Sequence, residues 1–146
     1  MKLYGYFRSS AAYRVRIALN LKDIAVEHVP VHLLKGGGEQ KSESFRLLNP
    51  QGLVPALALD EGTVLTQSLA IIDYLELIKP HPRLIPADPV LAAKTRAVAL
   101  AVGCEVHPLN NLRVLDYLKG ELGQPDAAVK AWYQHWVGEG LRRSKP

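Results

Sequence analysis

The sequence predicts two structural parts, an α/β unit followed by an all-helical unit. Residues 2–33 fit a strand, a helix and a second strand in succession. Further along, the segment "PHPRLIPADP" places four prolines in ten residues, which is typical of a linker, and no strand pattern follows it. We therefore predict an α/β domain at residues 1–79, a linker at 80–87 and an all-α domain at 88–146 that is incomplete at its C-terminal end.

The composition is that of a globular chain. Hydrophobic residues make up 48% of the 146 residues, which is enough for a buried core and argues against disorder. The net charge of +4 comes without a dense Lys/Arg block or interleaved aromatic residues, so we expect no nucleic-acid partner. No apolar stretch approaches the roughly 20 residues that span a bilayer, and no signal peptide opens the chain. We predict a cytoplasmic protein with no membrane partner.

Cysteine and histidine usage argues against two kinds of site. The single cysteine, Cys104, cannot form an internal disulfide framework or a cysteine-rich metal site. Only His28 and His32 show the spacing H-x-x-x-H, and they fall in a predicted strand, not on one face of a helix, so no metal is expected. The glycine run in "GGGEQ" lacks the Lys-Ser/Thr pattern of a phosphate-binding loop.

The first predicted elements form a β-α-β unit. Alternation in "KLYGY" predicts a short strand at Lys2–Tyr6, and Ser9 and Ser10 are good N-cap residues for the helix predicted at Ala11–Leu21. The apolar residues of that helix recur at helical spacing at Ala12, Val15, Ala18 and Leu19. The segment "IAVEHVPVHL" predicts a second strand, with Pro30 at an edge or a bulge. Such a unit implies a parallel strand pair and a right-handed crossover.

The sequence of the rest of the α/β unit predicts a loop, a helical turn, a hairpin and a helix. Three consecutive glycines indicate a flexible loop, and a helical turn at Phe45–Leu48 is stopped by Asn49-Pro50. The strands "LVPALALD" and "EGTVLTQ" meet across the turn Asp60-Glu61-Gly62. A helix then begins near Ser68, its predicted cap. The predicted core stripe of this helix is Leu69, Ile72, Leu75 and Ile78.

The predicted all-α unit contains two helical stretches. Residues 89–119 carry helical periodicity, which His107-Pro108 can kink or split in two. A further amphipathic helix begins at Asp126, after the turn "GELGQP". Two or three helices cannot bury apolar stripes on all sides, so we expect this unit to lean on the first domain and on a partner subunit, or to be a fragment.

Ser9-Ser10, at the predicted strand-to-helix junction, is the first of four candidate site features. A helix N-terminus carries unpaired N–H groups and about half a positive charge, which stabilises an anion such as a thiolate. Ordinary capping is the alternative. The next position, Ala11, is not a cysteine, so the protein itself supplies no thiol there.

The next two features are Val54-Pro55 and Gln67-Ser68. Proline at the start of a strand fits either an edge strand or a cis peptide, and in a cis turn the residue before it can offer its N–H and C=O to an extended ligand. At Gln67-Ser68 the backbone N–H and the hydroxyl at a helix start could hold a carboxylate, with an N-cap as the alternative.

The fourth feature is the polar pair Asn111 and Arg113 within the otherwise apolar segment "HPLNNLRVL". A guanidinium can hold a carboxylate through two parallel hydrogen bonds. The alternative is that Arg113 is a solvated helix residue. His107, before Pro108, fits a structural role better than a metal ligand.

The four features occur in the order found in soluble glutathione transferases, which the chain resembles. The segments "SSAAYRVRIAL", "NPQGLVPAL", "QSLAIIDYLE" and "HPLNNLRVLDYL" resemble the zeta class, which includes maleylacetoacetate and maleylpyruvate isomerases. The resemblance covers almost the whole chain. It implies a thioredoxin-like N-terminal domain, an all-α C-terminal domain, glutathione as cofactor and a homodimer.

The resemblance also implies roles for individual residues. Ser9 matches the activating serine, with Ser10 and Arg8 beside it as further catalytic residues. Arg8 and Arg113 match positions near the substrate carboxylates, and Arg8 fits an anion site independently because it directly precedes the serines. The residues implied to bind glutathione are Gln40 at its glycyl end, Val54 and cis-Pro55 at its backbone, Gln67 and Ser68 at its γ-glutamyl carboxylate, and Asn111.

The implied reaction is a glutathione-dependent cis-trans isomerisation in the degradation of aromatic compounds. The thiolate adds to the cis double bond of a maleyl keto acid, either maleylacetoacetate or maleylpyruvate. The resulting single bond rotates, and expulsion of glutathione leaves the trans fumaryl isomer. Since the nucleophile belongs to glutathione, Ala11 in place of the cysteine of many zeta sequences should not prevent this reaction.

Two other functions stay open at this point. One is a general zeta-class transferase or dehalogenase that uses the same thiolate on an electrophilic carbon. The other is a truncated, inactive glutathione-transferase-like module, because family members continue well past Leu141 with further helices.

Overall fold

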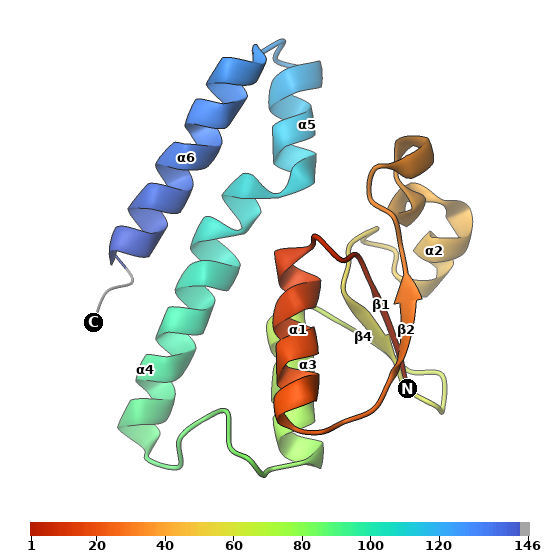
Figure 1. Ribbon diagram of the computed structural model, residues 1–146, viewed down its shortest axis with the longest axis vertical. Helices are drawn as coiled ribbons and strands as arrows, with labels where there is room; N and C mark the ends of the chain where they lie inside the picture. The colour runs from red at the N-terminus through yellow and green to blue at the C-terminus, as the bar shows by residue number, and fades with distance from the viewer. Residues whose placement is uncertain (144–146) are drawn as a thin grey trace. The chain divides into compact units, whose positions relative to one another are not determined.

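The computed structural model describes residues 1–143 and divides into two compact units (Figure 1). Unit 1 comprises Met1–Leu84, and unit 2 begins at Ile85. The division falls within the segment 80–87, where the prolines gather. Each unit is described by itself below.

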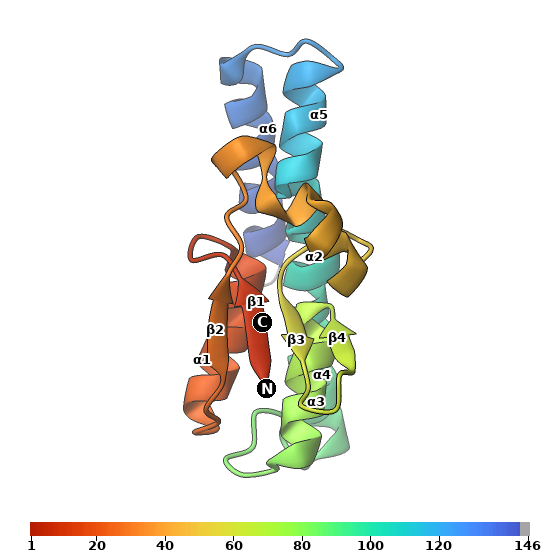
Figure 2. The ribbon, with the colours of Figure 1, turned by 90° about the vertical axis from the view of Figure 1, so that its right-hand side faces the viewer.

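Unit 1 is built on a four-stranded sheet in the order β2-β1-β3-β4 (Figure 2). Its strands are β1 (Lys2–Gly5), β2 (Glu27–Pro30), β3 (Ala56–Ala58) and β4 (Val64–Thr66). β1 pairs in parallel with β2, and the pairs β1–β3 and β3–β4 are antiparallel. The parallel pair agrees with the predicted β-α-β unit, because parallel neighbours need a crossover connection.

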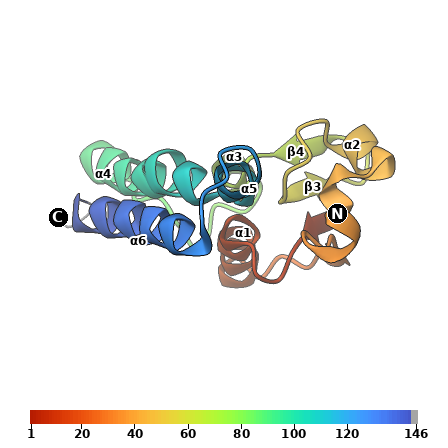
Figure 3. The same cartoon turned by 90° about the horizontal axis from the view of Figure 1, so that it is seen from above.

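Three α-helices complete unit 1. They are α1 (Ser10–Leu21), α2 (Glu43–Leu48) and α3 (Ser68–Ile78). α1 and α3 pack against each other on one face of the sheet, and α2 lies on the other side (Figures 2 and 3). The core between the sheet and these two helices consists of Leu3, Val15, Ala18, Leu19, Leu57, Ile71 and Leu75.

The predicted apolar stripe of the first helix is confirmed, and that of α3 is partly wrong. α1 buries Ala12, Val15, Ala18 and Leu19, as the spacing predicts. In α3 the buried residues are Ser68, Ile71 and Leu75, whereas Ile78 is 48% exposed. The apolar side chains of α3 cover too much of its circumference for periodicity alone to choose the buried face.

The segment after β2 is more ordered than the glycine run predicts. β2 stops at Pro30, before the end of the predicted strand, because its partner β1 ends at Gly5, whose carbonyl accepts the last bond of the ladder from the Val31 N–H at 2.8 Å. His32 then closes a tight turn: its Nδ1 accepts hydrogen bonds from the backbone N–H groups of Leu34 and Lys35 at 3.2 and 2.9 Å. Two short 3₁₀ turns follow, at Lys35–Gly37 and Glu39–Lys41.

A buried lysine ties the C-terminal ends of α1 and α3 together. The Lys22 side chain is fully buried, and its Nζ lies 2.7 Å from Glu76 Oε2. The same ammonium donates to the carbonyl oxygens of Lys79 and Pro82 at 2.6 and 3.1 Å. Glu76 also accepts from the backbone N–H of Leu84. The end of α1, the end of α3 and the following segment thus share one charged, hydrogen-bonded cluster.

Unit 2 is entirely helical within the described residues. It contains α4 (Pro89–Leu100), a π-helical segment η3 (Ala101–Val106), the 3₁₀ turn η4 (Pro108–Asn110), α5 (Leu112–Gly120) and α6 (Asp126–Arg143). The first predicted helical stretch is split around His107-Pro108. α6 packs against η3, η4 and α5, and Trp132 Nε1 donates to the Leu109 carbonyl at 2.8 Å. No helix within residues 1–143 is long and apolar enough to cross a membrane.

An exposed ion pair joins α5 to α6. Lys119 Nζ lies 2.7 Å from Asp126 Oδ1. The hydrogen bond to Asp126, together with attraction to its charge, raises the pKa of Lys119 above its usual value. Because both side chains are exposed, the pair positions the helix ends and adds little stability.

Close packing of α6 on η3 predicts that Gly140→Ala destabilises unit 2. A Cβ at Gly140 would overlap Val106 Cγ2 and lie 3.2 Å from Val106 Cβ. We expect the free energy of unfolding to fall by about 1–3 kcal/mol, measured by urea denaturation, because the packed helix cannot easily shift. Val106→Ala in the same chain should recover part of the loss.

Gly138→Ala in the same helix is the matched control. A Cβ there meets only the end of the Arg142 side chain, at 3.8 Å. This change should be neutral or stabilise by up to about 1 kcal/mol, since alanine is the better helix former. Equal destabilisation by both substitutions would contradict the predicted Gly140–Val106 contact.

Candidate functional site

The topology of unit 1 brings three of the predicted site segments to one edge of the sheet. In the registers Tyr4↔Ala56 and Ala56↔Thr66, the end of β1, the start of β3 and the end of β4 lie side by side. The residues after β1, before β3 and after β4 therefore meet at this edge. These residues are the segments around Ser9, Val54-Pro55 and Gln67-Ser68.

Ser9 both caps α1 and keeps a donor available. It is the N-cap of α1, with backbone angles φ −74° and ψ 115°, and its Oγ accepts from the Ala12 N–H at 3.2 Å. A serine hydroxyl has two lone pairs and one O–H, so this bond leaves the O–H able to donate to an anion. Capping and thiolate binding are therefore compatible at Ser9. Arg8 and Ser10, on either side, are exposed.

The Val54-Pro55 peptide is cis. Pro55 is buried directly before β3 and takes no place in the strand ladder. Asn49, which is 1% exposed, shapes the approach: its Nδ2 donates to the Leu53 carbonyl at 2.7 Å, and its Oδ1 accepts from the Gln51 N–H at 3.1 Å. Sequence reasoning treated Asn49 only as a helix stop. The turn-forming dipeptide Asn-Pro was the signal for this role.

The helix start at Gln67-Ser68 differs from the prediction. Gln67, not Ser68, is the N-cap of α3, and its side chain makes no capping hydrogen bond there. Gln67 has φ 65° and ψ 111°, a conformation that costs a non-glycine residue about 1–3 kcal/mol. Its Nε2 donates to Gln51 Oε1 at 3.1 Å. The N-terminal N–H groups of α3 are thus left without a side-chain cap in the described chain.

Arg14 joins this site and was missed by sequence reasoning. Its Nη1 lies 3.3 Å from the Oγ of Ser68, which is 7% exposed. The bond spans from the first turns of α1 to the first residue of α3, and it places a permanent positive charge beside the start of α3. In the sequence Arg14 is only a polar position outside the apolar stripe, so the contact had no local signal.

Gln40 lies in the turn Glu39–Lys41 and is 7% exposed. Its Nε2 donates to the Leu33 carbonyl at 3.4 Å, while its Oε1 is buried without a hydrogen-bond partner among the described residues. The side chain therefore closes its own loop, and the unpaired oxygen remains able to accept a hydrogen bond.

Asn111 and Arg113 lie in unit 2, apart in the chain from the other predicted site residues. Asn111 is the N-cap of α5, and its Oδ1 accepts from the Arg113 N–H at 3.1 Å. This capping bond explains the polar residue at the start of an apolar helix. Arg113 is exposed in the first turn of α5.

The part of the chain that the structure describes contains no group of three or more His, Cys, Asp or Glu residues that could hold a metal ion. The candidate site residues described above offer hydroxyl, amide and guanidinium groups and helix N-termini.

The backbone of Gln67 predicts that Gln67→Gly stabilises unit 1. Glycine adopts a positive φ without steric cost, so the free energy of unfolding should rise by about 1 kcal/mol after its greater unfolded-state entropy is subtracted. Gln67→Ala also removes the bond to Gln51 but keeps the unfavourable φ, so it should not stabilise. Urea denaturation of both variants checks the difference. Equal stabilities would show that residue 67 carries no backbone strain.

Comparison with known proteins decides the family. The model of the family "Glutathione S-transferase, N-terminal domain" matches residues 3–83, which cover nearly all of unit 1. The chain belongs to the glutathione S-transferase family. This glutathione S-transferase chain is 50% identical over 141 residues to a maleylacetoacetate isomerase of Pseudomonas aeruginosa, covering 97% of this chain and 66% of the relative. It is 48% identical to a maleylpyruvate isomerase of a Ralstonia species, covering 97% and 65%.

Solved glutathione S-transferase structures share the fold. A holo maleylpyruvate isomerase described as a bacterial zeta-class enzyme superposes with a TM-score of 0.93 at 46% identity, covering 98% of this chain and 66% of that chain. A maleylacetoacetate isomerase of Methylobacterium extorquens, solved with malonate and glutathione, also gives 0.93 at 43% identity, with the same coverage. The predicted thioredoxin-like glutathione-transferase fold and the resemblance to the zeta-class isomerases are confirmed.

The chain spans about two thirds of the length of the curated relatives it matches, between 65% and 66% for the first three.

Proposed function

We propose that this protein is a glutathione-dependent cis-trans isomerase that converts a maleyl keto acid, maleylacetoacetate or maleylpyruvate, to its fumaryl isomer. One observation carries the proposal. The Ser9 cap, the cis Val54-Pro55 peptide and the start of α3 at Ser68 meet at one sheet edge, in a chain about 50% identical to relatives named as these isomerases. We also propose that the protein is a homodimer in the cytoplasm. Measurement of its mass by light scattering would test the dimer.

The residues of unit 1 fit glutathione. A carboxylate suits the uncapped start of α3, where the N–H groups and the Ser68 hydroxyl point to a γ-glutamyl group, and Arg14 and the side chain of Gln67 lie beside it. Val54, before cis-Pro55, would pair its backbone with the glutathione backbone. The remaining contacts we propose are Gln40 at the glycyl end and Asn111 from unit 2.

Glutathione, when bound, supplies a thiolate that adds to the cis double bond and leaves after rotation about the resulting single bond. Ser9 donates its O–H to that sulfur, with Ser10 and Arg8 beside it, and the α1 N-terminus favours the negative charge. Arg8 and Arg113 orient the two carboxylates of the substrate and stabilise the charge that develops on its keto group.

The test of this function is turnover together with glutathione consumption. The purified chain should bind glutathione by calorimetry and isomerise maleylacetoacetate or maleylpyruvate with no net loss of thiol. Net consumption with a halogenated acid, and no isomerisation, would point to the general transferase or dehalogenase instead. A folded chain that does not bind glutathione would overturn both enzyme functions.

The proposed role of Arg113 predicts a selective loss of substrate affinity. Arg113→Ala should raise KM for the dianionic substrate by about tenfold or more, because a charge-assisted pair to a carboxylate is lost. Glutathione affinity should change little. Asp116, exposed on the same helix, provides the control variant Asp116→Ala, which should leave KM unchanged. An unchanged KM in Arg113→Ala would rule out the carboxylate role.

A further inference from the structure

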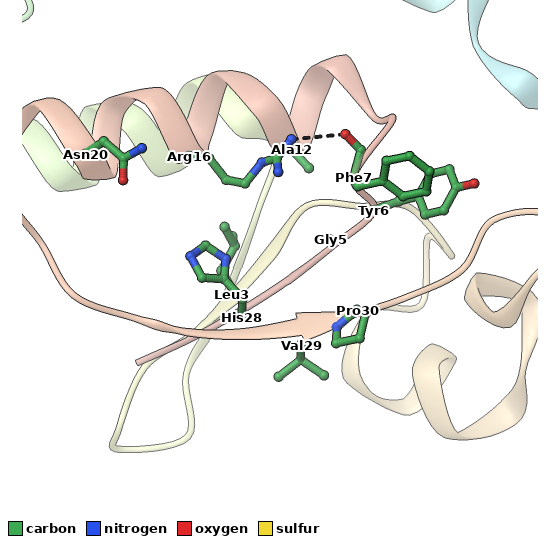
Figure 4. A pocket seen from close by; sticks show the side chains of 10 residues that line it. All are labelled: Leu3, Gly5, Tyr6, Phe7, Ala12, Arg16, Asn20, His28, Val29 and Pro30. Atoms are coloured by element: carbon green, nitrogen blue, oxygen red, sulfur yellow. Dashed lines mark hydrogen bonds between the residues drawn. The ribbon is translucent and has the colours of Figure 1, made fainter.

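A hollow in unit 1 lies between α1 and the edge strand β2 (Figure 4). Its volume is about 540 Å³, within the range typical of small-molecule sites. None of the residues proposed above to hold glutathione or its substrate lines it. The hollow therefore has no role in the function proposed so far.

Polar side chains face this hollow from both sides. Arg16 and Asn20 come from α1 and His28 comes from β2, and Figure 4 shows all three directed into the space between the helix and the strand. Each of them can donate a hydrogen bond to an anion. No acidic residue of the described chain lines the hollow. Glu27, which neighbours His28 in β2, pairs instead with Lys2 at 3.2 Å.

The guanidinium of Arg16 is held in place with part of its donor capacity unused. Its Nη2 donates to the Phe7 carbonyl at 3.0 Å, and its Cζ lies 5.1 Å from the centroid of the Tyr13 ring. Its Nε is buried and has no hydrogen-bond partner among the described residues. A buried donor left without an acceptor costs about 1–3 kcal/mol, so a small shift of the Arg16 side chain that brings Nε to an acceptor in the hollow would recover part of that cost.

The rest of the lining is apolar and would accept a compact hydrophobic body. Leu3 and Tyr6 contribute from β1 and the residue that follows it, and Pro30 contributes from the end of β2. A site of this kind combines a few convergent polar groups with an apolar wall.

We propose that this hollow binds a small organic carboxylate, in which the carboxylate meets Arg16, His28 and Asn20 and an aromatic or branched aliphatic body fills the apolar part. The charge selects an anion because Arg16 is permanently positive and no acid opposes it. The apolar wall favours a ligand whose remaining part carries no further charge. The site is independent of the proposed glutathione site, since the two share no residue.

The experiment is a titration of the ¹⁵N-labelled chain with benzoate, followed by NMR. Benzoate should shift the Arg16 Nε–H signal and the Asn20 and His28 signals along one saturable curve. Benzyl alcohol, a neutral match of similar shape, should bind at least about tenfold more weakly. Saturating glutathione should leave the benzoate curve unchanged, which separates this site from the proposed function.

Two arginine variants locate the binding. Arg16→Gln should lower the affinity for benzoate at least about tenfold. Arg46→Gln removes the same charge from the exposed face of α2 and should change that affinity less than about twofold. If Arg16→Gln does not fold, His28→Leu on the exposed edge strand takes its place with the same expected direction. Absence of saturation, equal effects of the two arginine variants, or displacement of benzoate by glutathione would each overturn the proposal.

Discussion

Replacing Ser9 with alanine is expected to slow the proposed isomerisation at pH 7 by about tenfold or more. A free thiol with a pKa of about 8.5 is only about 3% ionised at that pH, and a decrease of about two units makes most of it thiolate, at roughly 2.7 kcal/mol. The Ser9 O–H remains available for this because the hydroxyl oxygen, not its hydrogen, serves the helix cap. Without it the pKa of the bound thiol rises toward its ordinary value.

The pH dependence separates this effect from simple damage to the fold. In Ser9→Ala the loss should shrink as the pH rises toward 9, where even an unassisted thiol is mostly ionised. Loss of the cap alone, which costs about 1 kcal/mol, would lower stability without that pH trend. Turnover measured from pH 6 to 9, alongside urea denaturation, distinguishes the two.

Ser10→Ala and Ser9→Asp are the matched controls. Ser10→Ala should have a much smaller effect, because Ser10 lies inside α1 and is not its cap. Ser9→Asp keeps a good N-cap but places a carboxylate beside the thiolate, so stability should hold while turnover falls at least as far as in Ser9→Ala. Equal and small effects of Ser9→Ala and Ser10→Ala would defeat the role assigned to Ser9.

Substituting Lys22 by methionine is expected to lower the free energy of unfolding of unit 1 by about 3–5 kcal/mol. The change removes the Lys22 ammonium from the mostly buried carboxylate of Glu76, which keeps its hydrogen bond from the Leu84 N–H. It also leaves the Lys79 and Pro82 carbonyls without their buried donor. Urea denaturation of unit 1, followed by far-ultraviolet circular dichroism, measures the loss.

An exposed pair in the same unit gives the comparison for Lys22. Lys2 lies 3.2 Å from Glu27, with both side chains more than half exposed. Lys2→Met should cost less than about 1 kcal/mol, because water screens such a pair. The double variant Lys22→Met/Glu76→Leu should be more stable than Lys22→Met alone, since no charge is left unpaired. A Lys22→Met protein as stable as the Lys2 variant would show that the buried Lys22–Glu76 cluster does not stabilise unit 1.

Local sequence patterns predicted the local structure of two of the candidate site segments. Strand alternation before Ser9 and helical spacing after it located a cap at the α1 N-terminus, because both signals come from neighbouring residues. Proline at position 55, with its missing N–H, marked the start of β3, whereas the cis form came from the family resemblance because the local sequence left an edge strand open.

Contacts between distant residues were not predictable in the same way. The Arg14–Ser68 bond joins residues 54 apart, and the Lys22–Glu76 pair has the same separation of 54 positions. Neither helix contains a signal for the other, since each charged residue occupies an ordinary polar position in its own helix. The predicted cap of α3 was wrong for a related reason: Gln67, which connects β4 to α3, has a positive φ that its residue type does not predict.

By itself, the sequence determined the order of elements in the glutathione-transferase fold and the segments proposed to carry its site, because propensity, spacing and proline act over a few residues. Only the tertiary structure decided how those segments meet: the strand registers align the ends of β1, β3 and β4 at one edge. It also decided which face of α3 is buried, and that Arg16, Asn20 and His28 share a hollow. Such arrangements depend on long-range packing, whose free energy belongs to pairs of elements and not to any one segment.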